Sequence, residues 1–452
     1  MRMITGRALL LVGLGVGYGA PSSGQEVSLS ALLATADVAN PQIAAARQTA
    51  EAAAARVPQA GALPDPMVGL GFMNVPVADP GLGNDEMTMA QLRVEASFPW
   101  PGKLRLGEDV ARLEAEAAAW EVERARQEVR ADVETTYYQI YFLDRAVQVA
   151  GRNESLLADL TRLTSSRYAV GRAAQPDVLE AQVERTRLLD QLVALTQQRV
   201  SAVARLNALL ARATDTPLAT VALPDRVRLA ALDGVPGGAR FASTTLADVL
   251  PPRGTDGATG GDGTLPPVAE LQRLALERNP MIRAHGSRVE AQRGVLALAE
   301  RAKLPDFSVS AGYSHRAGLG DMFDVMVSAP LPIFSGRKQS QGVVEQGAML
   351  AQHEARHHAM VYEMNGEIAS LHAGLGRIQD QLVLLSDGIL PQARTGLEAS
   401  TASYWVGRVD FLALLDAQAA LYRHELDYHR LLADFATSVT ALERAVGAEV
   451  LP

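Results

Sequence analysis

The sequence predicts a mostly α-helical protein with a small β part, in which long helical hairpins carry four short strands. Three observations support this fold class: the composition, an internal duplication, and four segments where apolar and polar residues alternate. Of 452 residues, 48% are hydrophobic but only 5% are aromatic. A chain with much Ala, Glu, Gln and Arg and few aromatic residues is typical of long helices.

The charge balance and the absence of cysteine exclude several classes of function. There are 42 Lys and Arg residues against 51 Asp and Glu, and the net charge of −9 argues against a partner rich in nucleic-acid phosphates. Without cysteine there is no disulfide framework, cysteine-based zinc site, cysteine nucleophile or lipid-bearing N-terminal cysteine. With 21% charged residues and a mean hydropathy of +0.03, the chain is too polar for a helical membrane transporter.

The N-terminus has the layout of a secretory signal peptide. Arg2 and Arg7 precede a short apolar run at 8–16, and small residues follow at 22–24. We expect residues 1–24 to be removed; a disordered or anchoring N-terminus is the alternative. No other uninterrupted apolar stretch reaches the ~18 residues that a transmembrane helix needs. The sequence therefore predicts an exported chain without such a helix.

The same plan occurs twice, so the three domains that the length suggests become one duplicated unit. Asn-Pro at 40 returns at 279, and Leu-Pro-Asp at 63 returns at 304. Tyr-Ala-Val-Gly-Arg at 168–172 matches Tyr-Trp-Val-Gly-Arg at 404–408, and Leu-Glu-Ala-Gln at 179–182 matches Leu-Asp-Ala-Gln at 415–418, both displaced by 236 positions. We expect a first repeat at 25–232, a Gly- and Pro-rich linker at 233–264 and a second repeat at 265–452.

Each repeat is expected to hold a first helix, two strands, a very long helix, a turn and a further helix. In the first repeat the long helix spans 102–168, which at 1.5 Å per residue is on the order of 100 Å. Small residues at 115, 118, 122, 125 and 129 recur with spacings of three and four, which predicts a coiled-coil seam. Pro391 is expected to kink or break the matching helix of the second repeat.

Four segments alternate with period two, at 67–74, 89–100, 307–315 and 322–334. In the second of them Leu92 and Val94 share one face, while Arg93 and Glu95 share the other. This alternation fits an amphipathic sheet packed on a helix, and its length equally fits barrel strands that cross a membrane. Rods of roughly 100 Å leave no globular core for a sheet to cover, which favours the membrane.

Four strands cannot close a barrel, and open sheet edges cannot lie in lipid. The chain must then oligomerise, and three copies would supply a shared barrel of twelve transmembrane strands with room for water.

In the order of its motifs the chain resembles the TolC-like outer-membrane efflux proteins. The resemblance rests on three features: the two Tyr-x-x-Gly turns, each followed by Leu-Glu/Asp-Ala-Gln, the paired Asn-Pro sites, and the segments at 98–103 and 330–337 where the chain leaves a strand. It implies a homotrimer whose barrel lies in outer-membrane lipid and continues into a periplasmic α-helical tunnel. It also implies two partners, a periplasmic adaptor protein and an inner-membrane, proton-driven transporter. Neither an enzyme activity nor a cofactor is implied.

The two turns are the predicted distal tips of helical hairpins, since glycine turns a chain through positive φ. We expect the adaptor to dock on these tips, at Tyr168, Gly171, Arg172, Tyr404, Gly407 and Arg408. The resemblance further implies an acidic pore constriction, with Asp177 in the first repeat and Asp416 in the second, and with Arg408 as the basic residue of the turn. A second acid of that pattern is replaced by Ala413, and Arg408 lies one place from the usual position. For each tip residue, simple capping of the hairpin is the alternative, and for Asp416 a solvated helix face.

His353, Glu354 and His357 match the H-E-x-x-H signature of zinc peptidases, in which two histidines bind zinc and the glutamate acts as base. No third histidine follows at the metzincin spacing, where Met360 and Glu363 stand, and the segment falls inside a predicted rod. We therefore interpret it as a polar helix face without catalysis, with a periplasmic zinc peptidase as an unfavoured alternative.

The cargo is not determined by the sequence. The segments at 63–67, 73–76, 86–89 and 98–103 resemble the heavy-metal branch of the family, and the soft sulfur of methionine suits monovalent copper or silver. Packing inside a strand explains Met67 and Met73 equally well, and export of drugs or other small molecules remains open. Two other functions remain as alternatives, a duct for type I protein secretion and a purely structural coiled coil of the envelope.

Overall fold

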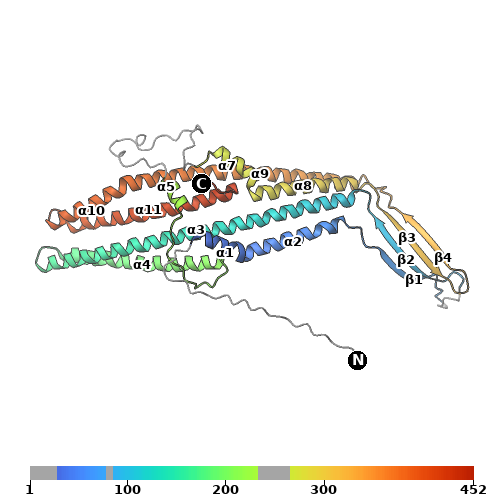
Figure 1. Ribbon diagram of the computed structural model, residues 1–452, viewed down its shortest axis with the longest axis horizontal. Helices are drawn as coiled ribbons and strands as arrows, with labels where there is room; N and C mark the ends of the chain where they lie inside the picture. The colour runs from blue at the N-terminus through green and yellow to red at the C-terminus, as the bar shows by residue number, and fades with distance from the viewer. Residues whose placement is uncertain (1–27, 78–84, 233–264, 452) are drawn as a thin grey trace, which may run out of the picture.

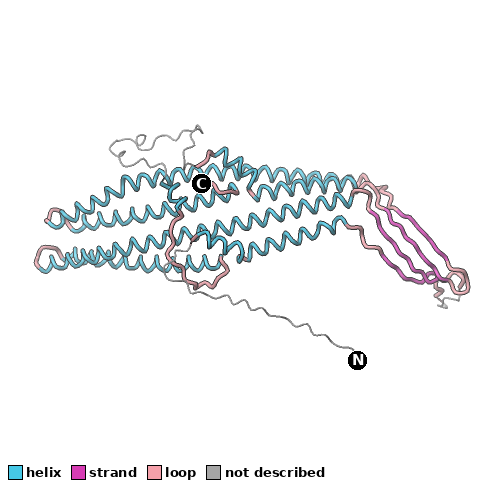
Figure 2. The backbone as a smooth tube through the Cα atoms, in the orientation of Figure 1, coloured by secondary structure: helices cyan, strands magenta, loops and turns pink. Residues whose placement is uncertain are grey.

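The computed structural model describes residues 28–77, 85–232 and 265–451. The predicted signal peptide and the predicted linker lie outside the described residues. The molecule is elongated, with the helices along its length and the strands together at one end (Figure 1). Figure 2 shows this separation of helix and strand along the backbone. The fold class expected from the sequence, mostly helix with a small antiparallel sheet, is confirmed.

The elements follow the same order in both repeats. The first repeat contains α1 (Leu29–Ala39), α2 (Pro41–Gly61), β1 (Met67–Met73), β2 (Met89–Phe98), α3 (Lys103–Ala169), α4 (Gln175–Leu209) and α5 (Asp225–Leu232). The second contains α7 (Val268–Arg278), α8 (Pro280–Arg301), β3 (Phe307–His315), β4 (Met322–Ser328), α9 (Gln339–Val383), η2 (Leu384–Ile389), α10 (Leu390–Trp405) and α11 (Phe411–Val446).

The two long helical hairpins have the same length. Gln339 starts α9 at 236 positions after Lys103 starts α3, and Trp405 ends α10 at 236 positions after Ala169 ends α3. The return helices α4 and α11 also begin 236 positions apart. The 67 residues of α3 correspond to roughly 100 Å, as the sequence predicts.

Two equivalent asparagines join the short helices to the hairpins. The side chain of Asn279 accepts a hydrogen bond from the Met281 amide at 2.9 Å and so caps α8, while its Nδ2 donates to the Ala445 carbonyl near the end of α11 at 2.8 Å. Asn40 does the same in the first repeat: it caps α2 and donates to the Leu209 carbonyl at the end of α4 at 2.9 Å. Each Asn-Pro site is thus a break between two helices and a clamp on the end of a third.

Pro391 alters the helix without breaking it. Its missing amide falls at the start of α10, and the six residues before α10 form the π-helical segment η2. A π segment accommodates the lost hydrogen bond while the rod continues. The sequence predicts a kink or a break at this proline; the structure has a π-helical segment there, and the helix does not break.

The sheet is antiparallel, in the order β1-β2-β3-β4. Strands β1 and β3 match their predicted ranges closely, but β4 is shorter than predicted and ends at Ser328, before Pro330 and Pro332. Proline has no amide to donate to a strand ladder, so the apolar alternation continues beyond the point where pairing stops. The turn between β3 and β4 lies at the end of the sheet away from the helices (Figure 1). The register places the paired residues Met73 and Met89 at the same end.

The core lies near the middle of the molecule, where α1, α3, α5 and α11 meet. Ile140 and Phe435 are fully buried there. The seam expected at 115–129 is only partly a seam: Val129 is buried, but Ala115, Ala118, Val122 and Ala125 are half-buried. The reason is that α3 packs against α2 on one side and α8 on the other, instead of against a single partner. Among the described residues, no helix is both long and apolar enough to cross a membrane.

Candidate functional site

The two hairpin tips close with the same backbone motif. Gly171 and Gly407 both have φ of 73°. In the first tip the Gly171 amide donates to the Tyr168 carbonyl and the Arg172 amide to the Arg167 carbonyl, and in the second tip Gly407 and Arg408 make the equivalent bonds. This is the Schellman ending of a helix, in which glycine takes the left-handed position without strain.

Exposed apolar side chains surround these turns. Tyr168 is 47% exposed and Trp405 59%, and both Val170 and Val406 are 68% exposed. Arg172 and Arg408 are exposed beside them. The sequence pointed to the tyrosines, glycines and arginines but missed the two valines and the tryptophan, although valine stands at the same place in both turns.

Tyr404 differs from its counterpart Tyr168, because its side chain is 5% exposed. Its ring packs on Phe411, and the guanidinium of Arg167 lies 4.7 Å from the ring centre. Arg167 also donates to the Tyr404 carbonyl at 2.7 Å. Arg167, which no sequence motif singles out, therefore links the first hairpin tip to the second, and the Tyr404 ring faces inward instead of toward a partner.

The acids of the tips have different roles. The carboxylate of Asp177 accepts from the Ala174 amide at 3.2 Å, at the start of α4. In the second repeat the cap is reversed: Asp410 accepts from the Ala413 amide at 3.0 Å. Each repeat thus carries one half of a capping box, and Asp177, which the sequence analysis places in the constriction, caps the start of α4. Asp416 is exposed and makes no hydrogen bond or ion pair within the part of the chain that the structure describes.

The sheet has one apolar and one polar face. Val68, Leu70 and Phe72 of β1 lie on the apolar face with Leu92 and Val94 of β2, and Phe323, Val325 and Val327 of β4 extend it. These side chains of β1 and β4 are 60–83% exposed.

On the polar face, Arg93 and Asp324 form an ion pair of 3.5 Å across β3. Ser310 and Ser314 of β3 are 3% exposed beneath their neighbours, whereas Tyr313 on the apolar face is 47% exposed. The longer side chains of the neighbouring strands therefore cover the serines of β3 on the polar face.

The H-E-x-x-H segment does not form a catalytic site. Glu354 is paired with Arg293 of α8 at 2.8 Å, which occupies the carboxylate that a peptidase would use as base. Burial, followed by the neighbouring His358, holds the pKa of His357 below its ordinary value. Among the described residues, no three His, Cys, Asp or Glu side chains are arranged to hold a metal ion.

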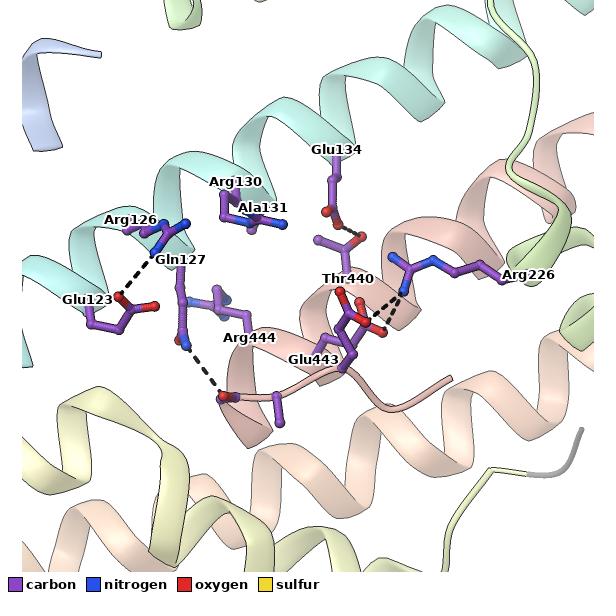
Figure 3. A pocket seen from close by; sticks show the side chains of 13 residues that line it. Glu123, Arg126, Gln127, Arg130, Ala131, Glu134, Arg226, Thr440, Glu443 and Arg444 are labelled. Carbon is purple, nitrogen blue, oxygen red and sulfur yellow. Dashed lines mark hydrogen bonds and ion pairs between the residues drawn. The ribbon is translucent and has the colours of Figure 1, made fainter. Parts of the chain in front are cut away.

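A cavity of about 260 Å³ lies near the middle of the molecule, lined by residues of α3, α5 and α11 and of the segment after α11 (Figure 3). Its charged lining consists of Arg126, Arg130, Arg226, Arg444, Glu123, Glu134, Glu443 and Glu449. Arg226 lies 3.6 Å from Glu443, and Glu134 accepts from the Thr440 hydroxyl at 2.7 Å.

Burial raises the pKa of Glu443, and the nearby Glu134 adds to this. The four arginines all have carboxylate partners. Arg226 pairs with Glu443 and Arg444 with Glu367, which joins α11 to α5 and α9, whereas Arg126 and Arg130 both pair with Asp37 and join α3 to α1.

The chain resembles known proteins over most of its length. A family model described as "Outer membrane efflux protein" matches residues 32–212 and 271–448. The cobalt-zinc-cadmium resistance protein CzcC of Cupriavidus metallidurans is 23% identical over 348 residues, which cover 75% of this chain and 74% of CzcC.

Among solved structures, the chain resembles CusC with a TM-score of 0.74 at 15% identity, over 94% of this chain and 92% of that one. It resembles VceC of Vibrio cholerae with a TM-score of 0.72 at 18% identity, over 93% of this chain and 96% of that one. These two likenesses show a common fold.

Proposed function

This chain belongs to the outer membrane efflux protein family, and from that premise we propose that it forms the passive exit duct of a tripartite pump for heavy-metal cations. Proteins of this family are outer-membrane channels, not enzymes, and they work as trimers with an adaptor and an inner-membrane transporter. The zinc-peptidase alternative is therefore wrong for this chain. The heavy-metal cargo is proposed from the likeness to CzcC, whose name specifies cobalt, zinc and cadmium.

The observation that carries the proposal is an open four-stranded sheet with an exposed apolar face, placed at the end of hairpins roughly 100 Å long. Within the described residues, both edge strands, β1 and β4, have one unpaired side. Unpaired backbone groups at such edges cost several kcal/mol each in lipid, so the sheet needs further copies to close it. Three copies give the twelve strands of the proposed barrel.

A second feature supports the trimer. Leu179, Val183, Leu189, Val193 and Val200 of α4 are 42–70% exposed. The side of α4 that packs on α3 is lined instead by Ala181, Leu188, Leu195 and Ala202. A long helix that is apolar on more than the side covered by its own chain is suited to a neighbouring copy.

We propose that the adaptor docks on the exposed tip residues Tyr168, Gly171, Arg172, Gly407 and Arg408, together with Val170, Val406 and Trp405. Exposed aromatic and arginine side chains are typical anchors of protein interfaces. Tyr404 belongs to this surface only through its backbone. The proposed transporter partner is proton-driven, as in the heavy-metal branch that the sequence resembles.

The decisive experiment is complementation. A strain that lacks the gene should become sensitive to at least one heavy-metal ion among cobalt, zinc, cadmium, copper and silver, and the full-length gene should restore tolerance. If deletion leaves metal tolerance unchanged and increases drug sensitivity, the cargo is a drug or another small molecule instead of a metal ion. Loss of a secreted protein would favour the type I secretion alternative.

The docking surface is tested with Arg172→Glu/Arg408→Glu, which should abolish tolerance while the trimer still assembles. Arg105→Glu, an exposed arginine at the opposite end of α3, is the matched control and should retain tolerance. Equal effects of the two changes would refute docking at the tips.

For the constriction, we propose that Asp416 alone among the predicted acids acts on passing ions, because Asp177 caps α4. Asp416→Asn should lower the preference of the reconstituted channel for cations over anions, and Asp177→Ala, which removes the capping acceptor, should lower stability instead. The same ion preference in wild type and Asp416→Asn would refute this role.

A further inference from the structure

All five methionines of the strands lie on the polar face of the sheet. The register pairs Met73 of β1 directly with Met89 of β2. It places Met67 beside Glu95, and it places Met322 and Met326 beside Ser314 and Ser310. We call Met67, Met73, Met89, Met322 and Met326 the thioether face. Methionine is apolar, so a barrel strand would ordinarily place it on the side that faces lipid. Its position on the polar face therefore needs an explanation.

The side chains of the thioether face are accessible. Met67 is 67% exposed, Met326 50%, Met322 49% and Met73 43%. They are therefore not explained by packing inside the sheet, which was the simpler interpretation of Met67 and Met73. When three copies close the sheet with the apolar face toward lipid, the polar face and its methionines line the water-filled interior.

The register also places the methionines in groups. Met73 and Met89 are directly opposite each other at the end of the sheet away from the helices, where Cβ atoms of paired residues are about 4.5–5.5 Å apart. Met67 and Met326 lie at the two ends of one cross-strand row, Met67-Glu95-Ser310-Met326, and thus at the two open edges of the sheet. Closure by copies of the chain brings an edge that carries Met326 against an edge that carries Met67.

The chemistry of these side chains selects a class of cation. A thioether is a soft, neutral ligand, which favours monovalent copper or silver over harder divalent ions. The charged pair between the methionine rows, Arg93 and Asp324, is neutralised internally at 3.5 Å. Thioethers carry no negative charge, so they hold a cation only weakly and the cation can leave them. Conduction through a channel requires several weak sites of this kind.

We infer that the thioether face is a series of weak binding sites for soft monovalent cations, Cu(I) or Ag(I), along the interior of the barrel. This inference rests on the proposed function, since it requires the polar face to line a channel. It narrows the cargo from heavy metals in general to those that prefer sulfur.

The test uses the full-length trimer in planar bilayers, in potassium nitrate, with silver nitrate as the probe. The potassium current reports the channel, and its block by silver reports the thioethers. Wild type should be half-blocked at a silver concentration at least tenfold below that for Met67→Leu/Met73→Leu/Met89→Leu/Met322→Leu/Met326→Leu. Zinc nitrate should affect both proteins equally.

Two further variants control the result. Adding Leu70→Met and Leu92→Met to the fivefold variant puts sulfur back on the apolar face, and this should not restore block by silver. Where the fivefold variant fails to assemble, Met73→Leu/Met89→Leu and Met67→Leu/Met326→Leu each keep the comparison, with at least a threefold shift expected.

The outcomes separate the inference from the function beneath it. Equal block of wild type and variants, or block restored by sulfur on the apolar face, overturns the thioether sites while the channel stands. A wild type without potassium current overturns the channel. In that case silver bound per chain, measured by mass spectrometry in detergent, decides whether the methionines bind: equal amounts on wild type and variant overturn the inference as well.

Discussion

Asn279 is expected to stabilise one junction in two separable ways. Its Oδ1 caps α8 through the amides of Met281 and Ile282, at 2.9 and 3.2 Å, and its Nδ2 satisfies the carbonyl of Ala445, which is 2% exposed. Loss of an N-cap costs about 1 kcal/mol. A buried carbonyl left without a partner costs about 1–3 kcal/mol. Asn279→Ala should therefore weaken the junction by about 2–4 kcal/mol, which is roughly a 30- to 700-fold increase in local opening.

Asn279→Ser distinguishes the two contributions, because serine is an equally good neutral N-cap and lacks the Nδ2 donor. It should cost about 1–3 kcal/mol, the part that belongs to the Ala445 carbonyl. Hydrogen–deuterium exchange of peptides that cover 275–283 and 443–449 measures both effects.

Asn40→Ala is the matched control, since Asn40 has the same two bonds in the first repeat. It should accelerate exchange at 38–44 and leave 275–283 unchanged. Exchange within threefold of wild type in both peptides of Asn279→Ala would refute the two-bond clamp. A Ser variant as fast as the Ala variant would refute the contribution of the cap.

Three further predictions concern the tips and the core. Gly407→Ala should destabilise the protein by about 1–2 kcal/mol, because a side chain is strained at the φ of 73°. Gly374→Ala, in open space on α9, should stabilise it by up to about 1 kcal/mol. Thermal unfolding in detergent measures both, and a stabilising Gly407→Ala or a destabilising Gly374→Ala would contradict this reasoning. Arg167→Met should remove about 2 kcal/mol of attraction to Tyr404. It should also broaden the distribution of distances between spin labels on cysteines placed at positions 170 and 406, which have no background because the chain has no cysteine. An unchanged distribution would count against Arg167 as the link between the two tips. Burial lowers the pKa of His429 to about 4, so the unfolded chain takes up a proton at a higher pH than the folded chain does. Stability should therefore fall as the pH drops from about 6.5 to about 4 and then level off. His429→Phe should flatten this part of the plot of melting temperature against pH, and a plot parallel to that of wild type would show that another group causes the loss.

The long helices and the strands could be predicted from sequence because their signals are local. Gly102 and Gly171 bracket α3, so its predicted range of 102–168 differs from the structure by one residue at each end. The polar and apolar faces of the sheet likewise follow from alternation alone. The excess length given to β4 arose because alternation continues through Pro330, where the ladder cannot.

The roles of individual tip residues could not be predicted, because they depend on which helix lies next to each copy of a motif. Tyr168 and Tyr404 occupy the same place in the same turn, yet only Tyr404 meets an arginine from the other hairpin. Asp177 was identified from a family pattern of acids, whereas the bond that occupies it is to a backbone amide three residues earlier. Its signal was the spacing of a helix cap, which could have been recognised.

The equal lengths of the two hairpins restrict how this chain can change length. Removing seven residues from α3 and α4 alone would withdraw the first tip by roughly 10 Å, about two helical turns, and would carry Arg167 out of reach of Tyr404. Insertions and deletions are therefore tolerated only when they occur in all four helical segments of the two hairpins together. A shorter or longer tunnel is reached by coordinated steps of whole turns, and a single unmatched insertion should prevent the two tips from meeting.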